Sequence, residues 1–460
     1  MTEFRNQTGR TVHIRTYGCQ MNVRDSEAIG ALLVRHGYQL EKNEGDADIV
    51  LVNTCSVRGK AEDKALGKLR LVVADKVTRP GRRVGAVGCM VQRLGAGILK
   101  EVKGLDFAAG THRLSALPAM IDAVYAGRGP LVDISDMEQE AESLTGHPDG
   151  TLSSFVNILL GCDRHCAYCI VPAVRGREWS RPAENVLTEI RALAGQGCRE
   201  ITLLGQSVIS YGLKNQVWPD GYHSPGGFAE PLPRLLEAVS AVPGVRRIRF
   251  TSGHPSGCTA ELARAMAEVP GVCDHLHLPV QSGSDAVLKR MRRGYTAGEY
   301  LAAVRRLRKA VPTLALTSDV IVGFPGESEA DFDATRRLMD EAAFDNAYIF
   351  KYSPREGTPA AAWVDDVTAE DKARRNRVLL EDQDRRGQAL NEATIGQEAS
   401  VLVEGPSLRN KERWAGRSST NKIVIFDPSE SVHVGDIVTV CVERVGPQVL
   451  YGTLKGESHS

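Results

Sequence analysis

Three cysteines within twelve residues are the most chemically specific feature of this sequence. Cys162, Cys166 and Cys169 lie in GCDRHCAYCIVP, with the spacing C-x3-C-x2-C. Structural zinc sites and most iron–sulfur clusters use four protein ligands, so this motif supplies one too few. Three thiolates can hold a [4Fe–4S] cluster and leave one iron open for a substrate or cofactor, whereas a distant His or Cys would complete a zinc site. The spacing alone leaves both alternatives open.

A second set of three cysteines is spread over the first ninety residues. Cys19, Cys55 and Cys89 stand in YGCQMN, NTCSVR and VGCMVQ, and each directly follows a predicted strand. The carboxyl ends of parallel strands meet at one edge of a sheet, so the three thiols can converge there. The sequence therefore predicts a second cluster with three ligands. The other four cysteines share no placement and are interpreted as packing residues: Cys198, Cys258, Cys273 and Cys441.

Length and composition indicate a globular protein with several domains. The chain has 460 residues, of which 42% are hydrophobic and 25% charged, which is typical of two to four soluble domains. No apolar run approaches the ~20 residues that span a bilayer, and the polar N-terminus has no signal-peptide core. We therefore expect a cytoplasmic protein, in which cysteines serve as ligands or core residues rather than in disulfides. A net charge of zero argues against binding nucleic acid by bulk charge.

The first segment alternates between strand-like and helix-like patterns, which favours a doubly wound parallel sheet of the α/β class over residues 10–127. The predicted helices cover 25–37 and 59–75. The predicted strands cover 11–18, 47–54, 82–88 and 105–110. Residues 128–150 are rich in Asp, Glu, Ser and Gly and are predicted to be a linker.

The central segment, 151–385, contains six predicted strands separated by helical patterns. This arrangement indicates a partial (βα)6 barrel with its site at the carboxyl ends of the strands, where the three-cysteine motif follows the first strand. A Gly- and Pro-rich insertion at 213–231 is expected to be functional or mobile. The predicted strands are 155–161, 200–205, 246–252, 275–281, 314–323 and 346–353.

The last segment, 388–456, follows a long charged helix predicted at 368–392. Five short strands separated by turn residues predict a small antiparallel β-barrel of the OB-like kind. A basic cluster around one tryptophan in this segment fits contact with RNA, and it equally fits a solvated hairpin with an incidental aromatic residue. Its members are Arg409, Lys411, Arg413, Trp414, Arg417 and Lys422. KRMRR, 289–293, is a second basic group, or else the exposed end of a helix.

The C-x3-C-x2-C motif after the first strand of such a barrel resembles the signature of radical S-adenosylmethionine enzymes. The resemblance implies that S-adenosylmethionine chelates the open iron and yields a 5′-deoxyadenosyl radical. It also implies a cofactor pocket built from the aromatic residue of the motif and from the ends of the second, fourth and fifth barrel strands. The residues at these places are Tyr168, Gly205, Gln206, Gln281, Ser282, Val322 and Gly323.

The chain as a whole resembles the methylthiotransferases, which join an auxiliary-cluster domain, a radical S-adenosylmethionine barrel and a C-terminal TRAM domain. YGCQMN, NTCSVRGKAEDK, GCDRHCAYCIVPAVRGRE, LPVQSGS and VLVEGPS most resemble the MiaB family, the tRNA-2-methylthio-N6-dimethylallyladenosine synthases. The sequence departs from the family's usual pattern at Ala173 and Gly253, which affects no cluster ligand and bears on substrate fit.

This resemblance implies transfer of a methylthio group to C2 of the isopentenylated adenosine next to the tRNA anticodon. It implies two [4Fe–4S] clusters, held by Cys162, Cys166 and Cys169 and by the N-terminal set, together with S-adenosylmethionine. The expected partners are the anticodon loop of tRNA and an electron donor such as flavodoxin or ferredoxin, and the expected state is a monomer. Two alternatives remain: a methylthiotransferase for another tRNA adenosine or a ribosomal protein, and a zinc-containing RNA-binding protein.

Overall fold

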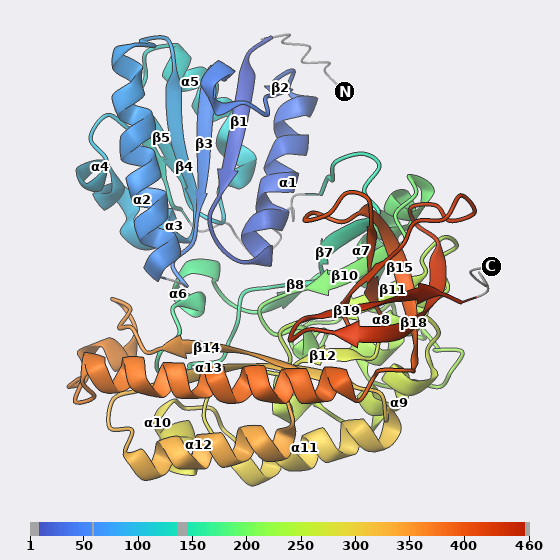
Figure 1. Cartoon of the computed structure of the whole chain (residues 1–460). Helices are drawn as coiled ribbons and strands as arrows, with labels where there is room; N and C mark the ends of the chain where they lie inside the picture. The colour runs from blue at the N-terminus through green and yellow to red at the C-terminus, as the bar shows by residue number, and fades with distance from the viewer. Residues whose placement is uncertain (1–8, 58, 136–144, 456–460) are drawn as a thin grey trace.

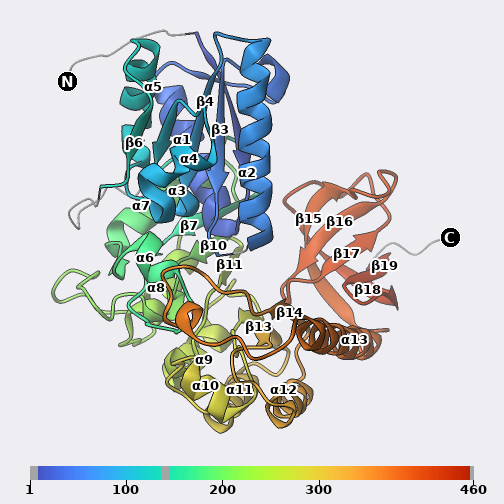
Figure 2. The same cartoon turned by 90° about the vertical axis from the view of Figure 1, so that its left-hand side faces the viewer.

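The computed structural model describes residues 9–57, 59–135 and 145–455. The N-terminal sheet domain lies above the central barrel in Figure 1, and the small C-terminal barrel lies beside the central one. Figure 2 shows the same three parts from the side, with α13 (Ala369–Glu392) running beneath the small barrel. None of the helices in the described ranges is long and apolar enough to cross a membrane.

The N-terminal domain is a six-stranded parallel sheet with the order β2-β1-β3-β4-β5-β6. Apolar clusters cover both of its faces, and every residue of the central β3 is buried, as expected for a doubly wound sheet. The strands are β1 (Thr11–Thr16), β2 (Gln39–Leu40), β3 (Ile49–Thr54), β4 (Arg83–Gly88), β5 (Phe107–Ala109) and β6 (Leu131–Asp133). The helices are α1 (Gln20–Arg35), α2 (Gly59–Ala74), α3 (Cys89–Leu94), α4 (Ile98–Glu101) and α5 (Leu117–Tyr125).

The structure adds elements that the sequence prediction did not contain, namely β2, β6 and the helices α3, α4 and α5, and it moves the start of α1. The strand β6 lies inside the predicted linker, because it pairs in parallel with β5 and extends the sheet. Helix α1 begins at Gln20, five residues earlier than predicted, because Cys19 acts as its N-cap in place of the usual Ser, Thr, Asp or Asn. Residues 136–144 of the predicted linker and residue 456 lie outside the described residues.

All six predicted strands of the central barrel are present. They form two parallel three-stranded sheets, β11-β10-β7 and β12-β13-β14, which a bridge between Ile248 and Val272 joins. The strands are β7 (Ser153–Asn157), β10 (Glu200–Leu204), β11 (Arg247–Phe250), β12 (His275–His277), β13 (Ala315–Val322) and β14 (Asn346–Lys351). The helices that cover them are α7 (Ala183–Gly195), α8 (Pro231–Ser240), α9 (Ala260–Glu268), α10 (Asp285–Arg290), α11 (Ala297–Ala310), α12 (Glu329–Ala342) and α13.

Three residues anchor the insertion at 213–231 to the barrel core, while its other residues are exposed or half-buried. Val217, Trp218 and Phe228 are buried in the main apolar cluster, and Trp218 stacks on Tyr222 with ring centroids 4.1 Å apart. Burial of large apolar side chains stabilises the insertion against the barrel. These contacts restrict the segment at three points, and the expectation that it is functional or mobile stays a prediction.

The C-terminal segment closes into a five-stranded barrel with the order β15-β16-β17-β19-β18, which confirms the predicted small barrel. It is not wholly antiparallel as predicted, because β17 and β19 pair in parallel. Valine, leucine and phenylalanine side chains fill its interior. The strands are β15 (Glu398–Pro406), β16 (Trp414–Ser418), β17 (Ile423–Phe426), β18 (Ile437–Val445) and β19 (Val449–Leu454).

Two buried arginines of β11 attach the small barrel to the central one. Arg249 donates hydrogen bonds to the carbonyl oxygens of Ser418 and Ser419, at 2.7 and 3.0 Å, and pairs with Glu200 at 2.9 Å. Arg247 donates to the carbonyl oxygens of Ser400, at 2.8 Å, and of residue 417. Four backbone acceptors on β15, on β16 and just after it are thereby fixed to one strand of the central barrel, which sets the orientation of the small barrel.

Replacing Arg247 by Met removes charged hydrogen bonds to buried carbonyl groups. Because each such bond contributes about 1.5–3 kcal/mol, the free energy of unfolding falls by roughly 2–5 kcal/mol, and the amides of β15 and β16 exchange faster. Chemical denaturation and hydrogen exchange measure both effects. Arg305→Met is the control, since Arg305 forms an exposed pair with Glu341 that is worth about 0–1 kcal/mol. Equal losses in the two variants would contradict the assigned role of Arg247.

Candidate functional site

The three-cysteine motif lies in a loop that a short antiparallel pair closes. β8 (Leu159–Leu160) pairs with β9 (Trp179–Ser180), and the amide of Cys162 donates to the carbonyl oxygen of Gly176 at 3.2 Å. The loop starts at Gly161, whose φ is +72°, and a Cβ there would lie 2.0 Å from the carbonyl oxygen of Arg177. Only glycine fits this position, so the loop that carries the cysteines depends on it.

A buried arginine that follows α10 contacts the motif. The Nη1 atom of Arg293 donates to Cys166 Sγ and to the Tyr168 hydroxyl, both at 3.3 Å, and its Nε donates to the Tyr295 hydroxyl at 3.0 Å. The exposed fraction of Arg293 is 8%. A fixed positive charge beside thiolates suits a negatively charged cluster. Sequence reasoning missed this role, because Arg293 was interpreted only as part of the basic run at 289–293.

Burial changes the acidity of two of the motif thiols, Cys162 and Cys169. Burial raises the pKa of Cys169 to about 12 and also raises the pKa of Cys162. A thiol of this kind is a poor nucleophile near neutral pH, and it becomes a thiolate when a metal replaces its proton. The motif is therefore suited to holding metal rather than to nucleophilic catalysis.

Two of the predicted cofactor residues carry features that point to a ligand. Neither side-chain amide atom of Gln206 has a hydrogen-bond partner, although both are buried. Gln281, at the end of the fourth barrel strand, has a φ of +73° and is 7% exposed. A buried amide without a partner and a strained non-glycine residue are both typical of binding sites. Gly205 packs so tightly on Leu159 that a Cβ would lie 3.0 Å from it.

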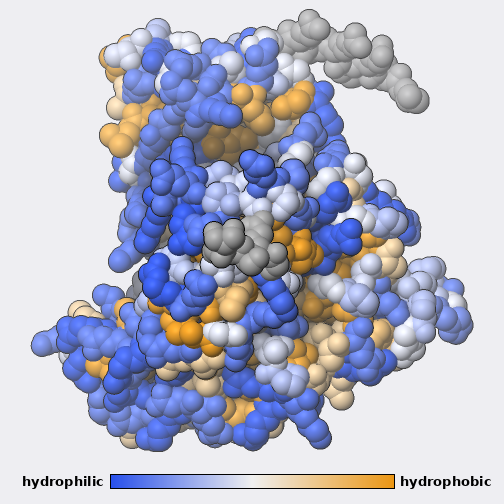
Figure 3. Space-filling view, turned by 45° about the vertical axis from the view of Figure 1, so that its right-hand side comes forward, coloured by the Kyte–Doolittle hydropathy of each residue, from blue (hydrophilic) through white to orange (hydrophobic). Residues whose placement is uncertain are grey.

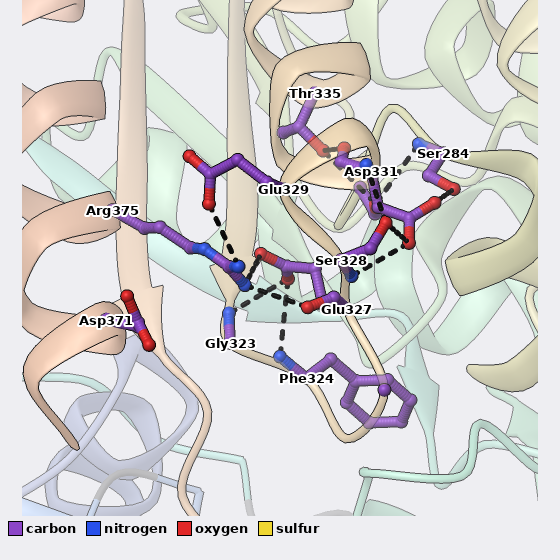
Figure 4. Close-up of polar contacts among 12 residues, drawn as sticks. Ser284, Gly323, Phe324, Glu327, Ser328, Glu329, Asp331, Thr335, Asp371 and Arg375 are labelled. Atoms are coloured by element: carbon purple, nitrogen blue, oxygen red, sulfur yellow. Dashed lines mark hydrogen bonds and ion pairs between the residues drawn. The ribbon is translucent and has the colours of Figure 1, made fainter. Parts of the chain in front are cut away.

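The other predicted cofactor residues have local structural roles. Figure 4 shows the turn after β13, in which Glu327 accepts hydrogen bonds from the amides of Gly323, at 2.9 Å, and Phe324, at 3.3 Å, and pairs with Arg375 at 2.9 Å. A Cβ on Gly323 would lie 2.2 Å from the Lys372 side chain of α13. The positive φ of +68° and the packing against Lys372 both favour glycine here, and the predicted contact of Gly323 with the cofactor stays a prediction.

Ser282 and Val322 also make contacts within the barrel itself. The Ser282 hydroxyl accepts from the amide of Ser284 at 3.2 Å and lies 3.3 Å from the Thr335 hydroxyl. Val322 is 1% exposed and belongs to the main apolar cluster. Both residues therefore support the strand ends that carry Gln281 and the glycine-rich turn.

The second set of cysteines lies at one edge of the N-terminal sheet. Cys19 is the N-cap of α1, Cys55 directly follows β3, and Cys89 is the first residue of α3. A hydrogen bond with Cys55 lowers the pKa of Cys19 to about 6, despite its burial. Burial raises the pKa of Cys89, and the charge of Arg175 opposes that shift. The three strand ends thus bring the three cysteines to the same edge.

One short helix lies between the two sets of cysteines. α6 (Val171–Arg175) begins two residues after Cys169, and Figures 1 and 2 show it between the barrel and the N-terminal sheet. Ile170 and Val174 pack against Cys89 in a small apolar cluster. The Thr111 hydroxyl donates to the carbonyl oxygen of Val174 at 2.6 Å. The motif loop of the barrel is therefore in contact with the N-terminal cysteine edge.

Thiol donors suit an iron–sulfur cluster, and three of them leave one iron of a [4Fe–4S] cluster open. Each of the two thiol sets also has a buried arginine that donates to one of its sulfurs, Arg293 in the barrel set and Arg175 in the N-terminal set. A positive charge beside the thiolates suits a negatively charged cluster.

Within the predicted RNA-binding cluster, Lys422 has a structural role. Its ammonium group pairs with Asp345 of the central barrel at 2.9 Å and donates to Asn391 of α13 at 2.7 Å. Trp414 packs partly against the core of the small barrel. Lys422 therefore helps to attach the small barrel, in addition to the two arginines of β11.

The remaining basic residues differ in their exposure. Arg413 and Arg417 form ion pairs with carboxylates of the small barrel, at 2.9 and 3.3 Å. Arg409 and Lys411 are exposed in the turn between β15 and β16. These two side chains are the members of the cluster best placed to contact a phosphate backbone.

A groove of about 1860 Å³ lies away from both sets of cysteines, between α1 and α7. Its lining includes Val34 and Leu40 of the N-terminal domain, which are about half exposed, and Leu193 of the barrel. Figure 3 shows apolar side chains scattered over a largely hydrophilic face of the molecule. The predicted cofactor residues do not line this groove, so the candidate site rests on the thiol sets and their surroundings.

Three family models match consecutive parts of the chain: "Uncharacterized protein family UPF0004" over residues 11–110, the radical SAM superfamily over 156–339, and the TRAM domain over 392–455. The chain is 41% identical to a tRNA-2-methylthio-N(6)-dimethylallyladenosine synthase of Methylacidiphilum infernorum, over 96% of this chain and 94% of the relative. It is 42% identical to the enzyme of that name from Moorella thermoacetica, over 97% and 98%. The chain belongs to the tRNA-2-methylthio-N(6)-dimethylallyladenosine synthase family.

Solved structures support the fold. The radical S-adenosylmethionine methyltransferase TsrM of Kitasatospora setae matches with a TM-score of 0.54 and 14% identity, over 77% of this chain and 74% of the other. As a member of a radical S-adenosylmethionine family, the chain uses S-adenosylmethionine and a [4Fe–4S] cluster. This membership confirms an enzyme and sets aside the zinc-containing RNA-binding protein.

Comparing Gly161→Ala with Gly221→Ala distinguishes the steric requirement of the motif loop from the backbone strain that alanine has at any positive φ. Gly161 and Gly221 have φ values of +72° and +76°, but a Cβ at Gly221 meets nothing within 4 Å. Alanine at either position carries the same backbone strain, and only Gly161→Ala forces the motif loop away from Arg177. We expect Gly161→Ala to lose the iron of the barrel cluster while Gly221→Ala keeps it. Equal iron content in the two reconstituted variants would contradict the assigned role of Gly161.

Proposed function

We propose that this chain transfers a methylthio group to C2 of N6-dimethylallyladenosine next to the anticodon of tRNA. The observation that carries the proposal is the contact, through α6, between two sets of three cysteines in a chain that matches this family over nearly its whole length. One set suits a radical S-adenosylmethionine cluster and the other a second [4Fe–4S] cluster. A single-cluster enzyme would have no use for the second set.

The chemistry explains why such cofactors are needed. C2 of the adenine ring is neither acidic nor electrophilic, so acid–base and nucleophilic groups have little effect on it. When bound, the cofactors supply radical chemistry and a methyl group, and the protein supplies positions, charges and shielding from water. Cys162, Cys166 and Cys169 would hold the barrel cluster, with Arg293 donating to Cys166, and Gln206 is placed to bind S-adenosylmethionine at the adjacent strand end.

The small barrel supports binding of tRNA. The target base must leave its stack to enter the protein, and a single-stranded loop makes this less costly than a duplex. Arg409 and Lys411 can contact the tRNA backbone, while Arg247, Arg249 and Lys422 hold the small barrel in one orientation. The base and the two clusters then keep a fixed geometry, which favours reaction.

The remaining features of the proposal concern the setting of the reaction. The electron for the barrel cluster comes from a one-electron carrier such as flavodoxin or ferredoxin, because cleavage of S-adenosylmethionine to the adenosyl radical consumes one electron. The enzyme acts as a monomer, since one chain carries both thiol sets and the RNA-binding barrel. It acts in the cytoplasm, because its proposed substrate, tRNA, is found there.

The number of clusters is tested by iron and sulfide analysis after anaerobic reconstitution. The wild type should hold about eight irons per chain. Replacing Cys162, Cys166 and Cys169 by Ala should leave about four, and so should replacing Cys19, Cys55 and Cys89. Replacing Cys198, Cys258 and Cys273 by Ala is the matched control and should leave about eight. If the N-terminal triple variant keeps all its iron, the second cluster is wrong and a single-cluster enzyme remains.

The substrate is tested by mass analysis of tRNA from a strain that lacks this chain. We expect 2-methylthio-N6-isopentenyladenosine to disappear and its precursor without the methylthio group to accumulate, while other modifications stay intact. Complementation with the wild type restores the product, and complementation with Cys162→Ala does not. Loss of a different methylthioadenosine, or of a modified ribosomal protein, would instead support one of the alternative methylthiotransferases.

A further inference from the structure

Arg175 is a buried cation that the barrel inserts into the N-terminal cysteine edge. It is the last residue of α6, and its exposed fraction is 7%. Its Nε donates to Cys89 Sγ at 3.3 Å, and its Nη2 donates to the Asp25 carboxylate at 2.6 Å. A buried guanidinium is costly unless its donors are satisfied by such partners. Its presence at this place therefore calls for an explanation beyond packing.

The two partners of Arg175 lie on the elements that carry the N-terminal cysteines. Asp25 is on α1, whose N-cap is Cys19, and Cys89 begins α3. Arg175 is itself six residues after Cys169, the last cysteine of the barrel motif. One side chain thus connects a cysteine of the N-terminal set to the helix that directly follows the other set.

We infer that Arg175 is a positioning residue for the N-terminal cluster, which donates a hydrogen bond to its Cys89 ligand and sets its reduction potential together with Asp25. This inference rests on the second cluster of the proposed function. Hydrogen bonds to the sulfurs of a cluster and the net charge around it are known determinants of its potential. The guanidinium stabilises the reduced, more negative form of the cluster, whereas the Asp25 carboxylate opposes this effect.

The charges of Arg175 and Asp25 predict that replacing one or the other shifts the midpoint potential of the cluster in opposite directions. Arg175→Met removes a positive charge and a sulfur hydrogen bond, so the midpoint potential of the cluster falls. Asp25→Asn removes a negative charge and leaves the guanidinium in place, so the midpoint potential rises. Arg175→Lys keeps the charge but loses the planar fork, so its potential lies between those of Arg175→Met and the wild type. A purely structural contact would give no such ordered series.

Arg24 provides a matched control at the same domain boundary. Like Asp25, Arg24 lies on α1. It is 1% exposed and pairs across the boundary with Glu189 of α7 at 3.1 Å. Its ion pairs with Glu27 and Glu189 are with carboxylates. Arg24→Met weakens the boundary to a similar degree and should leave the midpoint potential unchanged.

The experiment uses the full chain in which Cys162, Cys166 and Cys169 are Ala, reconstituted anaerobically, so that only the N-terminal cluster contributes. Iron analysis comes first: a background with no iron overturns the second cluster and the inference with it. With about four irons present, a redox titration followed by electron paramagnetic resonance gives the midpoint potential of each variant. A lowered potential for Arg175→Met and a raised one for Asp25→Asn support the inference.

Other outcomes are equally decisive. Unchanged potentials in Arg175→Met and Asp25→Asn, with iron retained, overturn the inference while the second cluster stands. If Arg175→Met does not retain iron, Asp25→Asn and Arg175→Lys decide: a raised potential in Asp25→Asn supports the inference, and unchanged potentials in both overturn it. A shift in Arg24→Met as large as that in Arg175→Met also overturns it, because the effect would then follow from the domain boundary alone.

Discussion

The short helix α6 limits how far apart the two sets of cysteines can lie. It has five residues and is therefore about 7.5 Å long. One end begins two residues after Cys169, and the other end places Arg175 against Cys89. Any chemistry that passes a group between two clusters requires that they share one enclosed region. In this chain α6 meets that requirement in two ways. It is joined through the backbone to the barrel motif, and its Arg175 makes a buried contact with Cys89 of the N-terminal set.

Buried arginines hold the three parts of the chain around this region. Arg24 pairs with Glu189 between the N-terminal domain and the barrel, and Arg247 and Arg249 attach the small barrel. Burial alone would raise the pKa of Glu189, but a hydrogen bond from His147 and the charges of nearby arginines lower it to about 2. The carboxylate is therefore charged throughout the neutral range. Because buried pairs lose several kcal/mol when one partner is removed, they fix orientation strongly.

Much of this architecture follows from the sequence because the main signals are local. β-branched runs and helical periodicity predicted the six barrel strands, and the cysteine sets were found from their spacing and their positions after strands. The N-terminal extension of α1 was missed because Cys19 is not a usual N-cap residue. The short strand β6 was missed because its pairing with β5, rather than its composition, makes it a strand.

The contacts around the cysteines could not be predicted in the same way. Arg175 and Arg293 each stand in short basic stretches that resemble exposed surface, and their burial depends on contacts with residues far away in the sequence. Lys422 was interpreted as an RNA contact because its neighbours are basic, whereas tertiary packing places it against Asp345. The packing of Gly323, in the turn after β13, against Lys372 of α13 also depends on residues far apart in the sequence.

The shared region can be tested by measuring the magnetic interaction between the two clusters in the reconstituted full chain. With both clusters reduced, electron paramagnetic resonance should show spin–spin coupling with a narrow distribution of distances. The coupling should vanish when either set of three cysteines is replaced by Ala. Two independent signals without coupling in the wild type would mean that the clusters do not face one region, and the arrangement around α6 would not serve a joint reaction.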